Sequence, residues 1–524
     1  MNRNSSLVSS RLSVRHPSLK FHPSPPSQRH LGFALDVSAS RRVHQKMIQQ
    51  APRRSKSSLL HLACSATVLL CLGALSAFAA PPNIVVFISD DHTMRDSSVY
   101  GSKEIATPHM DMIAAAGMTF DRAFAPSPSC APSRGALLTG LMPARNGAEP
   151  NHSEPRADIK KLPAYLQELG YEVVAFGKVG HYKQTEHFGF DHFEHTGYHE
   201  DIAILAALEW LRNRTSTKPL ALFVGSNWPH VPWPLTVEGH DPAALTIPGN
   251  HVDTPATRLF RGKYYAAIGR MDAELGAVWQ LAQEKFGKNL FFQCFADQRA
   301  QWPFGKWCLY DDGIRTPLIT VWPGHIAPGT RTSAMVSLID VLPTLVEVAG
   351  GQAPEGLDGR SFKKVLLGET DHFRDLIFST HSGDGNMNVF PSRCVRDERW
   401  KYILNLHPEF KFTTHITETS GDDGNYWKSW VQKAGVDPVA AAKVHRYQER
   451  PREELYDLQN DSLEEHNVAA DPANDAVLKK MREALEAWMK QQGDQSKIYG
   501  SPKLLSAPAN PEKDSKAEKD SEKD

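Results

Sequence analysis

Long apolar stretches of two kinds alternate along the chain. Unbroken runs rich in β-branched and aromatic residues, without polar alternation, are typical of strands buried on both faces of a parallel sheet. Between them lie segments whose apolar residues recur at helical spacing. The strand-like runs are residues 83–89, 171–176, 220–225 and 290–296, and the helical segments are 107–116, 162–169, 202–211 and 264–284. This alternation predicts an α/β fold in which helices sandwich one large, mostly parallel sheet.

The pattern continues with a strand predicted at 314–322 and a helix at 337–350. Residues 356–369 then predict a loop and a short helix. We interpret this segment as the end of a first domain, which covers residues 83–370.

A smaller second region follows. Strands predicted at 376–379 and 399–404 indicate a C-terminal antiparallel sheet, and Asp471-Pro472 is typical of the start of a helix. We expect a C-terminal α+β subdomain over 371–499. Residues 500–524 are mainly Lys, Glu, Asp, Ser and Pro, which predicts a disordered charged tail.

Residues 1–80 predict an extension that is not part of the folded domains. The stretch before Met47 is rich in Ser, Pro and Arg and has no periodic apolar pattern. A basic segment, an apolar run over 59–78 and Ala77-Phe78-Ala79 then follow in the order of a secretory signal peptide. A membrane anchor is the alternative, but the small residues and the prolines after them favour cleavage. We therefore expect export to the periplasm or the cell exterior, no stable membrane span after cleavage, and a true start at Met47.

Composition and charge limit the classes of partner that the sequence predicts. The formal net charge is −1 and charges of both signs are mixed, so nothing favours nucleic-acid binding. Of the six cysteines, two fall in the predicted signal and Cys130 belongs to a candidate site. Cys294, Cys308 and Cys394 show no disulfide spacing. We predict buried thiols, with a Cys294–Cys308 bridge as the alternative. The sequence does not indicate an oligomeric state.

Acidic and amide side chains follow two of the predicted strands. Asp90 and Asp91 end the first strand-like run, and Asp297 and Gln298 end the last. Ligands of open α/β sheets bind beyond the carboxyl ends of the strands, and adjacent carboxylates repel unless a cation holds them. A solvated turn is the alternative for the first pair alone. Oxygen ligands from two strand ends suit Ca²⁺ or Mg²⁺ and do not suit zinc.

Cys130 lies in a proline-punctuated turn that precedes a helix. Pro132 predicts that this helix begins at Pro132 or Ser133. Cys130 would then lie at a helix N-terminus, where backbone N–H groups and the macrodipole favour an anion. Arg134 would return to the same face one turn later. The alternative is an ordinary buried cysteine beside a surface arginine.

Basic residues follow other predicted strands. Lys178 and His181 come after the second strand-like run, His230 after the third, and Lys306 shortly after the fourth. A single lysine or histidine in such a position is more often a surface loop residue than a catalytic residue. Their shared position past strand ends favours one site at the same edge of the sheet.

Residues 130–134, Cys-Ala-Pro-Ser-Arg, with Leu-Thr-Gly at 138–140, resemble the modification motif of the type I sulfatases, which share the alkaline phosphatase-like fold. In that family a formylglycine-generating enzyme oxidises the cysteine to formylglycine, whose hydrated aldehyde attacks the sulfur of a sulfate ester or sulfamate. The resemblance spans roughly 83–492. Arg145-Asn146-Gly147 and 399–406 are similar to segments of the heparan N-sulfatases (sulfamidases), which implies a sulfated carbohydrate as substrate.

The same resemblance implies a metal site. Asp90, Asp91 and Asp297 match the family's metal ligands, and Asp297 would also help deprotonate the nucleophile. Gln298 stands where the family has Asn or His, and Arg299 stands where Gly is typical. The implied cofactor is Ca²⁺, with Mg²⁺ as the alternative. The two departures put full activity in question.

The resemblance also implies roles for the basic residues. Arg134, Lys178 and Lys306 would neutralise the sulfate group during reaction. His230 or Lys306 would protonate the leaving oxygen or nitrogen. His181 would accept a proton from the remaining hydroxyl, a role that suits a group titrating near neutral pH.

Three functions are compatible with these residues. The favoured one is an exported, Ca²⁺-dependent sulfatase that hydrolyses sulfate ester or N-sulfate groups of a sulfated glycan, N-sulfoglucosamine above all. A phosphomonoester or phosphonate hydrolase on the same scaffold is the second, because sulfate and phosphate monoesters are similar tetrahedral oxyanions. The third is a catalytically impaired glycan-binding protein, motivated by Gln298 and Arg299.

Overall fold

Strand β1 (Asn83–Ser89) is buried on both faces. Its alternate side chains enter two separate hydrophobic cores, with Val85 and Phe87 in one and Ile84 and Val86 in the other. This is the burial expected of an unbroken apolar strand. The computed structural model describes residues 81–195, 202–418 and 425–507.

The large sheet has eight strands in the order β10-β2-β9-β7-β1-β6-β4-β5. β9 runs antiparallel to β2 and β7, and the other neighbouring pairs are parallel. The further strands of this sheet are β2 (Met118–Phe120), β4 (Glu172–Gly177), β5 (His192–Glu194), β6 (Leu220–Gly225), β7 (Leu290–Ala296), β9 (Leu318–Val321) and β10 (Thr330–Thr332). The predicted α/β fold with a mostly parallel sheet is confirmed.

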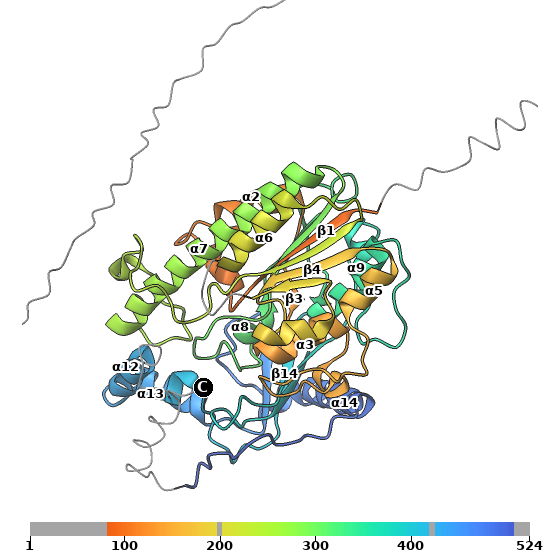
Figure 1. The fold of residues 1–524 in the computed structure, drawn as a ribbon. Coiled ribbons are helices and arrows are strands. Elements are labelled where there is room, and N and C mark those ends of the chain that lie inside the picture. The colour runs from red at the N-terminus through yellow and green to blue at the C-terminus, as the bar shows by residue number, and fades with distance from the viewer. Residues whose placement is uncertain (1–80, 196–201, 419–424, 508–524) are drawn as a thin grey trace, which may run out of the picture. The chain divides into compact units, whose positions relative to one another are not determined.

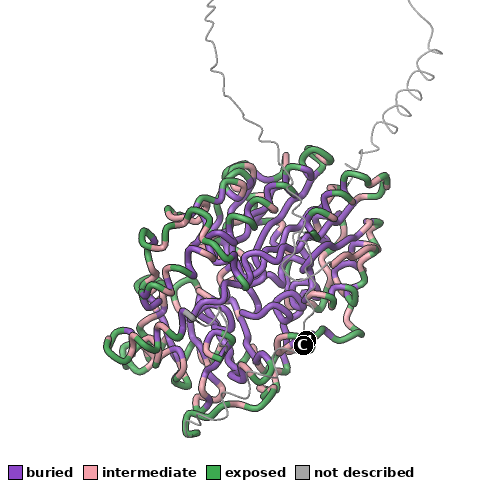
Figure 2. Tube along the Cα trace, turned by 60° about the vertical axis from the view of Figure 1, so that its left-hand side comes forward, coloured by how far each residue is buried: buried purple, intermediate pink, exposed green. Residues whose placement is uncertain are grey.

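Helices cover both faces of this sheet (Figure 1). One face carries α2 (Pro108–Ala116), α6 (Ile202–Asn213) and α7 (Pro255–Phe286), and the other carries α3 (Cys130–Thr139), α5 (Leu162–Glu168) and α9 (Val341–Val348). Figure 2 shows the buried residues along the strands, with exposed residues on the outer helices and loops. Other described helices are α4 (Pro143–Asn146), α8 (Asp311–Ile314), α10 (Lys363–Leu366), α11 (His415–Glu418), α12 (Asn425–Ala434) and α13 (Pro438–Gln448).

Helix α7 begins nine residues before the predicted start at Tyr264. Its start has clear local causes. The Thr254 side chain accepts a hydrogen bond from the Thr257 N–H at 3.0 Å, and Pro255 occupies the first helical position. Both features are common at helix N-termini.

The single strand predicted at 314–322 is wrong. The chain forms β8 (Arg315–Thr316), passes Pro317, and continues as β9. β8 belongs to a separate three-stranded sheet with β3 (Ala123–Phe124) and β11 (Val336–Ser337), whereas β9 belongs to the large sheet. Proline has no N–H to donate to a ladder, so it marks the point where the chain changes sheets.

The C-terminal sheet has four antiparallel strands, in the order β12-β13-β14-β15. Helix α14 (Asp475–Gln492) packs on it, and the Trp488 ring stacks on the Phe378 ring with centroids 4.6 Å apart. The smaller antiparallel sheet with its helix is therefore confirmed, while the boundary between 370 and 371 stays a prediction. The strands are β12 (Ile377–His381), β13 (Ser392–Arg396), β14 (Trp400–Asn405) and β15 (Glu453–Asp457).

Both ends of the chain reach beyond the described residues. The predicted extension and signal peptide, 1–80, lie outside them, as do residues 508–524. The predicted tail begins at residue 500, and the structure describes it as far as residue 507. This part is hydrogen-bonded to the folded domain, since the Lys411 N–H donates to Lys503 O at 2.8 Å. Among the helices that the structure describes, none is long and apolar enough to cross a membrane. The four described cysteines are free and buried, which confirms the predicted thiols.

Candidate active site

The candidate site lies past the carboxyl ends of four neighbouring strands. Asp90 and Asp91 follow β1, Asp297 and Gln298 follow β7, Lys178 follows β4, and His230 comes five residues after β6. In the sheet these strands have the order β7-β1-β6-β4 and run parallel, so their carboxyl ends share one edge. The structure thus brings together residues that are far apart in the sequence.

Helix α3 supplies Cys130 and Arg134 to this site. The helix begins at Cys130, with Ser129 before it in an extended conformation. The predicted start at Pro132 or Ser133 is therefore two to three residues late. Pro132 lies within the first helical turn, where N–H groups have no intrahelical partner and a missing N–H costs nothing. Cys130 consequently lies in the first turn of the helix rather than in the turn before it.

The Cys130 thiol is surrounded by polar side chains. Its Sγ lies 3.1 Å from Gln298 Nε2, 3.7 Å from Lys178 Nζ and 3.7 Å from Asp90 Oδ1. The residue is only 1% exposed. Burial raises the pKa of this thiol to about 12, although Lys178 and Lys306 oppose the shift. An unmodified Cys130 is therefore a neutral thiol at pH 7, and the thiolate is the nucleophilic form of cysteine.

Arg134 joins the two acidic strand ends. Its Nε donates to Asp297 Oδ2 at 2.8 Å, and its Nη2 donates to Asp90 Oδ1 at 3.3 Å. Nη1 donates to the main-chain carbonyls of Lys178 and Val179. The planar guanidinium thus uses its fixed fork of donors to hold β1, β4 and β7 in register.

Two lysines pair with the carboxylates after β1. Lys178 Nζ lies 2.5 Å from Asp90 Oδ2, and Lys306 Nζ lies 2.8 Å from Asp91 Oδ2. Burial alone would raise the pKa of Asp90, but Lys178 and the other nearby cations outweigh it and hold this pKa well below its usual range. Asp90 is therefore ionised in spite of its burial.

The oxygen-bearing side chains fit a hard divalent cation. Asp90, Asp91, Asp297 and Gln298 are all at most 1% exposed, and Gln298 Oε1 has no hydrogen-bond partner among the described residues. One ligand atom each from Asp90, Cys130 and Asp297 lies within 4.8 Å of the others. Asp91 adopts a left-handed backbone with φ of 62°. Gln298 Nε2 donates to Asp91 Oδ1, so the amide borders the carboxylates, and its oxygen would take that place if the amide were turned over. Three carboxylates and an amide oxygen are a donor set that suits Ca²⁺ or Mg²⁺.

Arg299 does not enter this donor set. Its Nη1 donates to Asp311 O at 2.8 Å and lies 2.8 Å from Asp312 Oδ1. Arg299 is also absent from the described residues with positive φ, so its backbone does not need glycine. Its side chain is occupied by a buried ion pair away from Cys130, and the bulk of that side chain is therefore no obstacle to metal binding.

The two predicted histidines differ in their surroundings. His230 Nδ1 donates to Val231 O at 2.6 Å, and its Nε2 lies 3.6 Å from Asp91 Oδ2. His181 lies at the margin of the site. Its ring packs against the Tyr182 ring, with centroids 4.5 Å apart, and the Tyr182 hydroxyl lies 3.1 Å from Lys178 Nζ.

Two residues near His181 were not predicted as part of the site. His181 Nε2 lies 3.0 Å from His152 Nδ1, and His152 Nε2 lies 3.2 Å from Asp384 Oδ1. His152 belongs to a loop after α4, and Asp384 to the loop between β12 and β13. Neither lies at a strand end of the large sheet, so the pattern that located the other residues could not find them.

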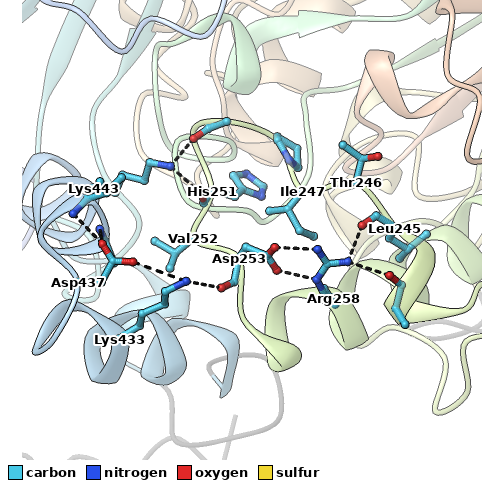
Figure 3. A pocket seen from close by; sticks show the side chains of 15 residues that line it. Leu245, Thr246, Ile247, His251, Val252, Asp253, Arg258, Lys433, Asp437 and Lys443 are labelled. Carbon is cyan, nitrogen blue, oxygen red and sulfur yellow. Dashed lines mark hydrogen bonds and ion pairs between the residues drawn. The ribbon is translucent and has the colours of Figure 1, made fainter.

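A separate cavity of about 590 Å³ lies between residues 243–258 and helices α12 and α13 (Figure 3). Its charged groups are already paired: Arg258 holds Asp253 in a bidentate ion pair, and Lys433 Nζ lies 3.6 Å from Asp437 Oδ2. Lys443 donates to main-chain carbonyls. None of the predicted site residues lines this cavity.

The fold is shared with solved hydrolase structures. One, described as in complex with its substrate D-glucosamine-2-N,6-O-disulfate, has a TM-score of 0.60 at 21% identity and covers 79% of this chain and 99% of that chain. A phosphonate monoester hydrolase from Silicibacter pomeroyi has a TM-score of 0.61 at 18% identity, over 79% and 96%. These likenesses place the chain in the alkaline phosphatase-like fold.

Sequence comparison defines the family within that fold. A sulfatase family model matches residues 82–351, and a model described as N-sulphoglucosamine sulphohydrolase, C-terminal, matches 300–414. An ulvan-active sulfatase from Formosa agariphila is 32% identical over 83% of this chain and 87% of its own length. Human N-sulphoglucosamine sulphohydrolase is 27% identical over 81% and 93%. The chain belongs to the sulfatase family and is a sulfuric ester hydrolase.

Proposed function

We propose that this chain hydrolyses sulfate ester or N-sulfate groups of a sulfated glycan, with N-sulfoglucosamine as the favoured unit. The reaction uses formylglycine derived from Cys130 by a formylglycine-generating enzyme, and a divalent cation, Ca²⁺ with Mg²⁺ as the alternative. The protein acts after export. The observation that carries the proposal is the convergence of a buried Cys130, three cationic side chains and four oxygen-bearing side chains on one sheet edge.

The charge balance supports a sulfated substrate. Arg134, Lys178 and Lys306 pair with three carboxylates, so these groups together are neutral when all three carboxylates are ionised. When bound, a divalent cation supplies two further positive charges beside the substrate oxygens, and the hydrated aldehyde at position 130 supplies the nucleophilic oxygen. The three fixed cations stabilise charge that develops on the sulfate oxygens without reorganising.

The histidines support the proton transfers. His230 Nδ1 donates to Val231 O, which leaves Nε2 on the side of Asp91, where the protonated ring can deliver its Nε2 hydrogen to the leaving oxygen or nitrogen. Burial lowers the pKa of His181 well below its usual range, and Lys178 lowers it further. A neutral His181 is suited to accept a proton.

The favoured substrate follows from the relatives. The human relative is named N-sulphoglucosamine sulphohydrolase, and the matching C-terminal family model carries the same name. The Formosa agariphila relative is named for activity on ulvan, another sulfated polysaccharide. Both names support a sulfated glycan, and the first supports an N-sulfated sugar.

The test begins with the side chain at position 130. Mass spectrometry of the tryptic peptide Ala123–Arg134, from protein made in its native host, is expected to show formylglycine or its hydrate. The purified protein is expected to release sulfate from N-sulfoglucosamine faster than from glucosamine 6-sulfate, and far faster than it releases phosphate from an aryl phosphate. Cys130→Ala is the matched inactive variant. Turnover by a protein whose Cys130 is unmodified would refute the mechanism, and preferred phosphate release would refute the substrate class.

A further inference from the structure

A chain of hydrogen bonds joins His181 to a carboxylate from the C-terminal region. It runs from His181 Nε2 to His152 Nδ1 at 3.0 Å, and from His152 Nε2 to Asp384 Oδ1 at 3.2 Å. The other oxygen of Asp384 is occupied, because Trp307 Nε1 donates to Oδ2 at 2.8 Å and Asn151 Nδ2 donates to it at 2.9 Å. Asp384 is thus held in place with Oδ1 turned to His152.

The direction of each hydrogen bond follows from the ionised carboxylate. Burial opposes ionisation of Asp384, but its hydrogen bonds from His152, Trp307 and Asn151 outweigh burial and hold its pKa well below the usual range. A carboxylate only accepts, so His152 Nε2 carries a hydrogen. When His152 carries its only ring hydrogen on Nε2, its Nδ1 accepts, and His181 Nε2 donates to it. His181 Nδ1 is therefore left with its lone pair.

In the part of the chain that the structure describes, no side chain or main-chain group pairs with this free atom. His181 Nδ1 is buried and has no hydrogen-bond partner among the described residues. The charged groups that act on the His181 ring are Lys178, Arg134, Asp90 and His152. Three of these belong to the cluster around Cys130. A buried nitrogen with a free lone pair beside that cluster is placed to receive a proton from a reacting group.

We propose that His152 and Asp384 are positioning residues that fix His181 in the tautomer with an unprotonated Nδ1, so that this atom accepts the proton released in the sulfate-releasing step. The proton role rests on the proposed function, whereas the tautomer does not. On accepting the proton His181 becomes an imidazolium, and Asp384 stabilises that charge through the His152 Nε2 hydrogen. His181 is thus a base that is oriented by other side chains, an arrangement that is common in enzymes with an activated nucleophile.

His152 also connects the buried His181 ring to solvent. Its side chain is 62% exposed, whereas His181 is only 5% exposed. The backbone of His152 is left-handed, with φ of 64°, and Gln184 Nε2 donates to its carbonyl at 2.8 Å. A left-handed backbone at a non-glycine residue persists only where surrounding contacts hold it. Such backbones are common at functional sites. A proton received at the buried ring can thus pass to the exposed one and on to water.

The first test reads the tautomer without any turnover. Nitrogen-15 NMR of the histidine rings, in the full chain carrying Cys130→Ala, is expected to show His181 with hydrogen on Nε2 only. Adding His152→Ala is expected to convert His181 to a mixture of tautomers. The matched control is His187→Ala, because His187 is an exposed histidine on the neighbouring turn that pairs with Glu154 at 2.8 Å. A His181 tautomer that is unchanged by His152→Ala would overturn the proposal.

The second test reads the proton transfer in the active enzyme. His152→Ala and Asp384→Asn are each expected to lower kcat for sulfate release about tenfold or more and to shift the pH dependence of kcat. His187→Ala is expected to do neither. If His152→Ala raises only KM, His152 is a substrate contact and the proposal is wrong. If the wild-type protein releases no sulfate while the tautomer behaves as expected, the proposed function fails and the relay geometry stands.

Discussion

Arg134 Nε donates to Asp297 Oδ2 across 2.8 Å, and both side chains are completely excluded from solvent. The contact links α3, one turn after Cys130, to the residue that follows β7. It therefore fixes the distance between Cys130 and the oxygen-bearing side chains that are proposed to hold a metal. Structural and chemical roles coincide in this one ion pair.

We expect Arg134→Met to lower the free energy of unfolding by about 3–5 kcal/mol, because it leaves Asp297 buried without its paired cation, whereas Asp90 keeps Lys178. Urea unfolding measures the change. The matched control is Arg122→Met, since Arg122 forms an ion pair with Glu398 at 2.7 Å whose side chains are 28% and 65% exposed. Its expected cost is below about 1 kcal/mol. Equal losses in the two variants would contradict the assignment of Arg134 as a buried structural cation.

Ca²⁺ is expected to raise the Tm of the protein, because a ligand that binds only the folded state stabilises it by about 2.7 kcal/mol at one hundred times its Kd. Asp91→Asn should abolish this shift. Asp121→Asn should preserve it, since Asp121 pairs with Arg331 at an exposed site. Melting curves in EDTA, Ca²⁺, Mg²⁺ and Zn²⁺ make the measurement. A larger shift with Zn²⁺ than with Ca²⁺ would count against the oxygen-ligand site.

Arg299→Gly is expected to destabilise the protein and to give no gain in the rate of sulfate release. The guanidinium is 4% exposed and pairs with Asp312, which has Arg95 as a second partner, so we expect a loss of about 3 kcal/mol. Paired measurements of urea unfolding and kcat test both statements, with Arg299→Lys as the conservative control. A faster Arg299→Gly enzyme would show that this side chain does restrain the site.

The stability of the protein should fall in acid partly because of His381. Burial lowers the pKa of His381 to about 4 from 6.5, so between these values the unfolded chain binds a proton that the folded chain does not. Its stabilising contribution is therefore present above pH 6.5 and is lost as the pH falls through 4. His381→Gln should lose less stability than wild type over this range, by up to about 3 kcal/mol. Parallel slopes of unfolding free energy against pH for the two proteins would rule the assignment out.

Strand ends were predictable because local sequence determines them. The apolar runs 83–89 and 290–296 coincide with β1 and β7, and each passes directly into acidic or amide residues. Parallel pairing then brings Asp90 and Asp297 together without any need to know the loops. Most of the proposed metal and charge cluster follows from this one rule.

Contacts made by loops were not predictable in the same way. His152 meets Asp384 because the loop between β12 and β13 packs beside residues 150–152, where the Asn151 N–H donates to Gly383 O at 2.9 Å. No periodicity or motif in either segment predicts that contact. The change of sheets at Pro317 was missed for a related reason, since an apolar run interrupted by one proline still has the composition of a single strand.

The burial of Cys130 determines when that residue can be altered. All residues of α3 are buried, and Cys130 itself is 1% exposed. The enzyme proposed to oxidise this side chain has to reach its sulfur, and the packed helix leaves that atom inaccessible. We therefore infer that the proposed modification of Cys130 precedes the packing of α3. The rate at which α3 packs onto the sheet sets the time available for that encounter.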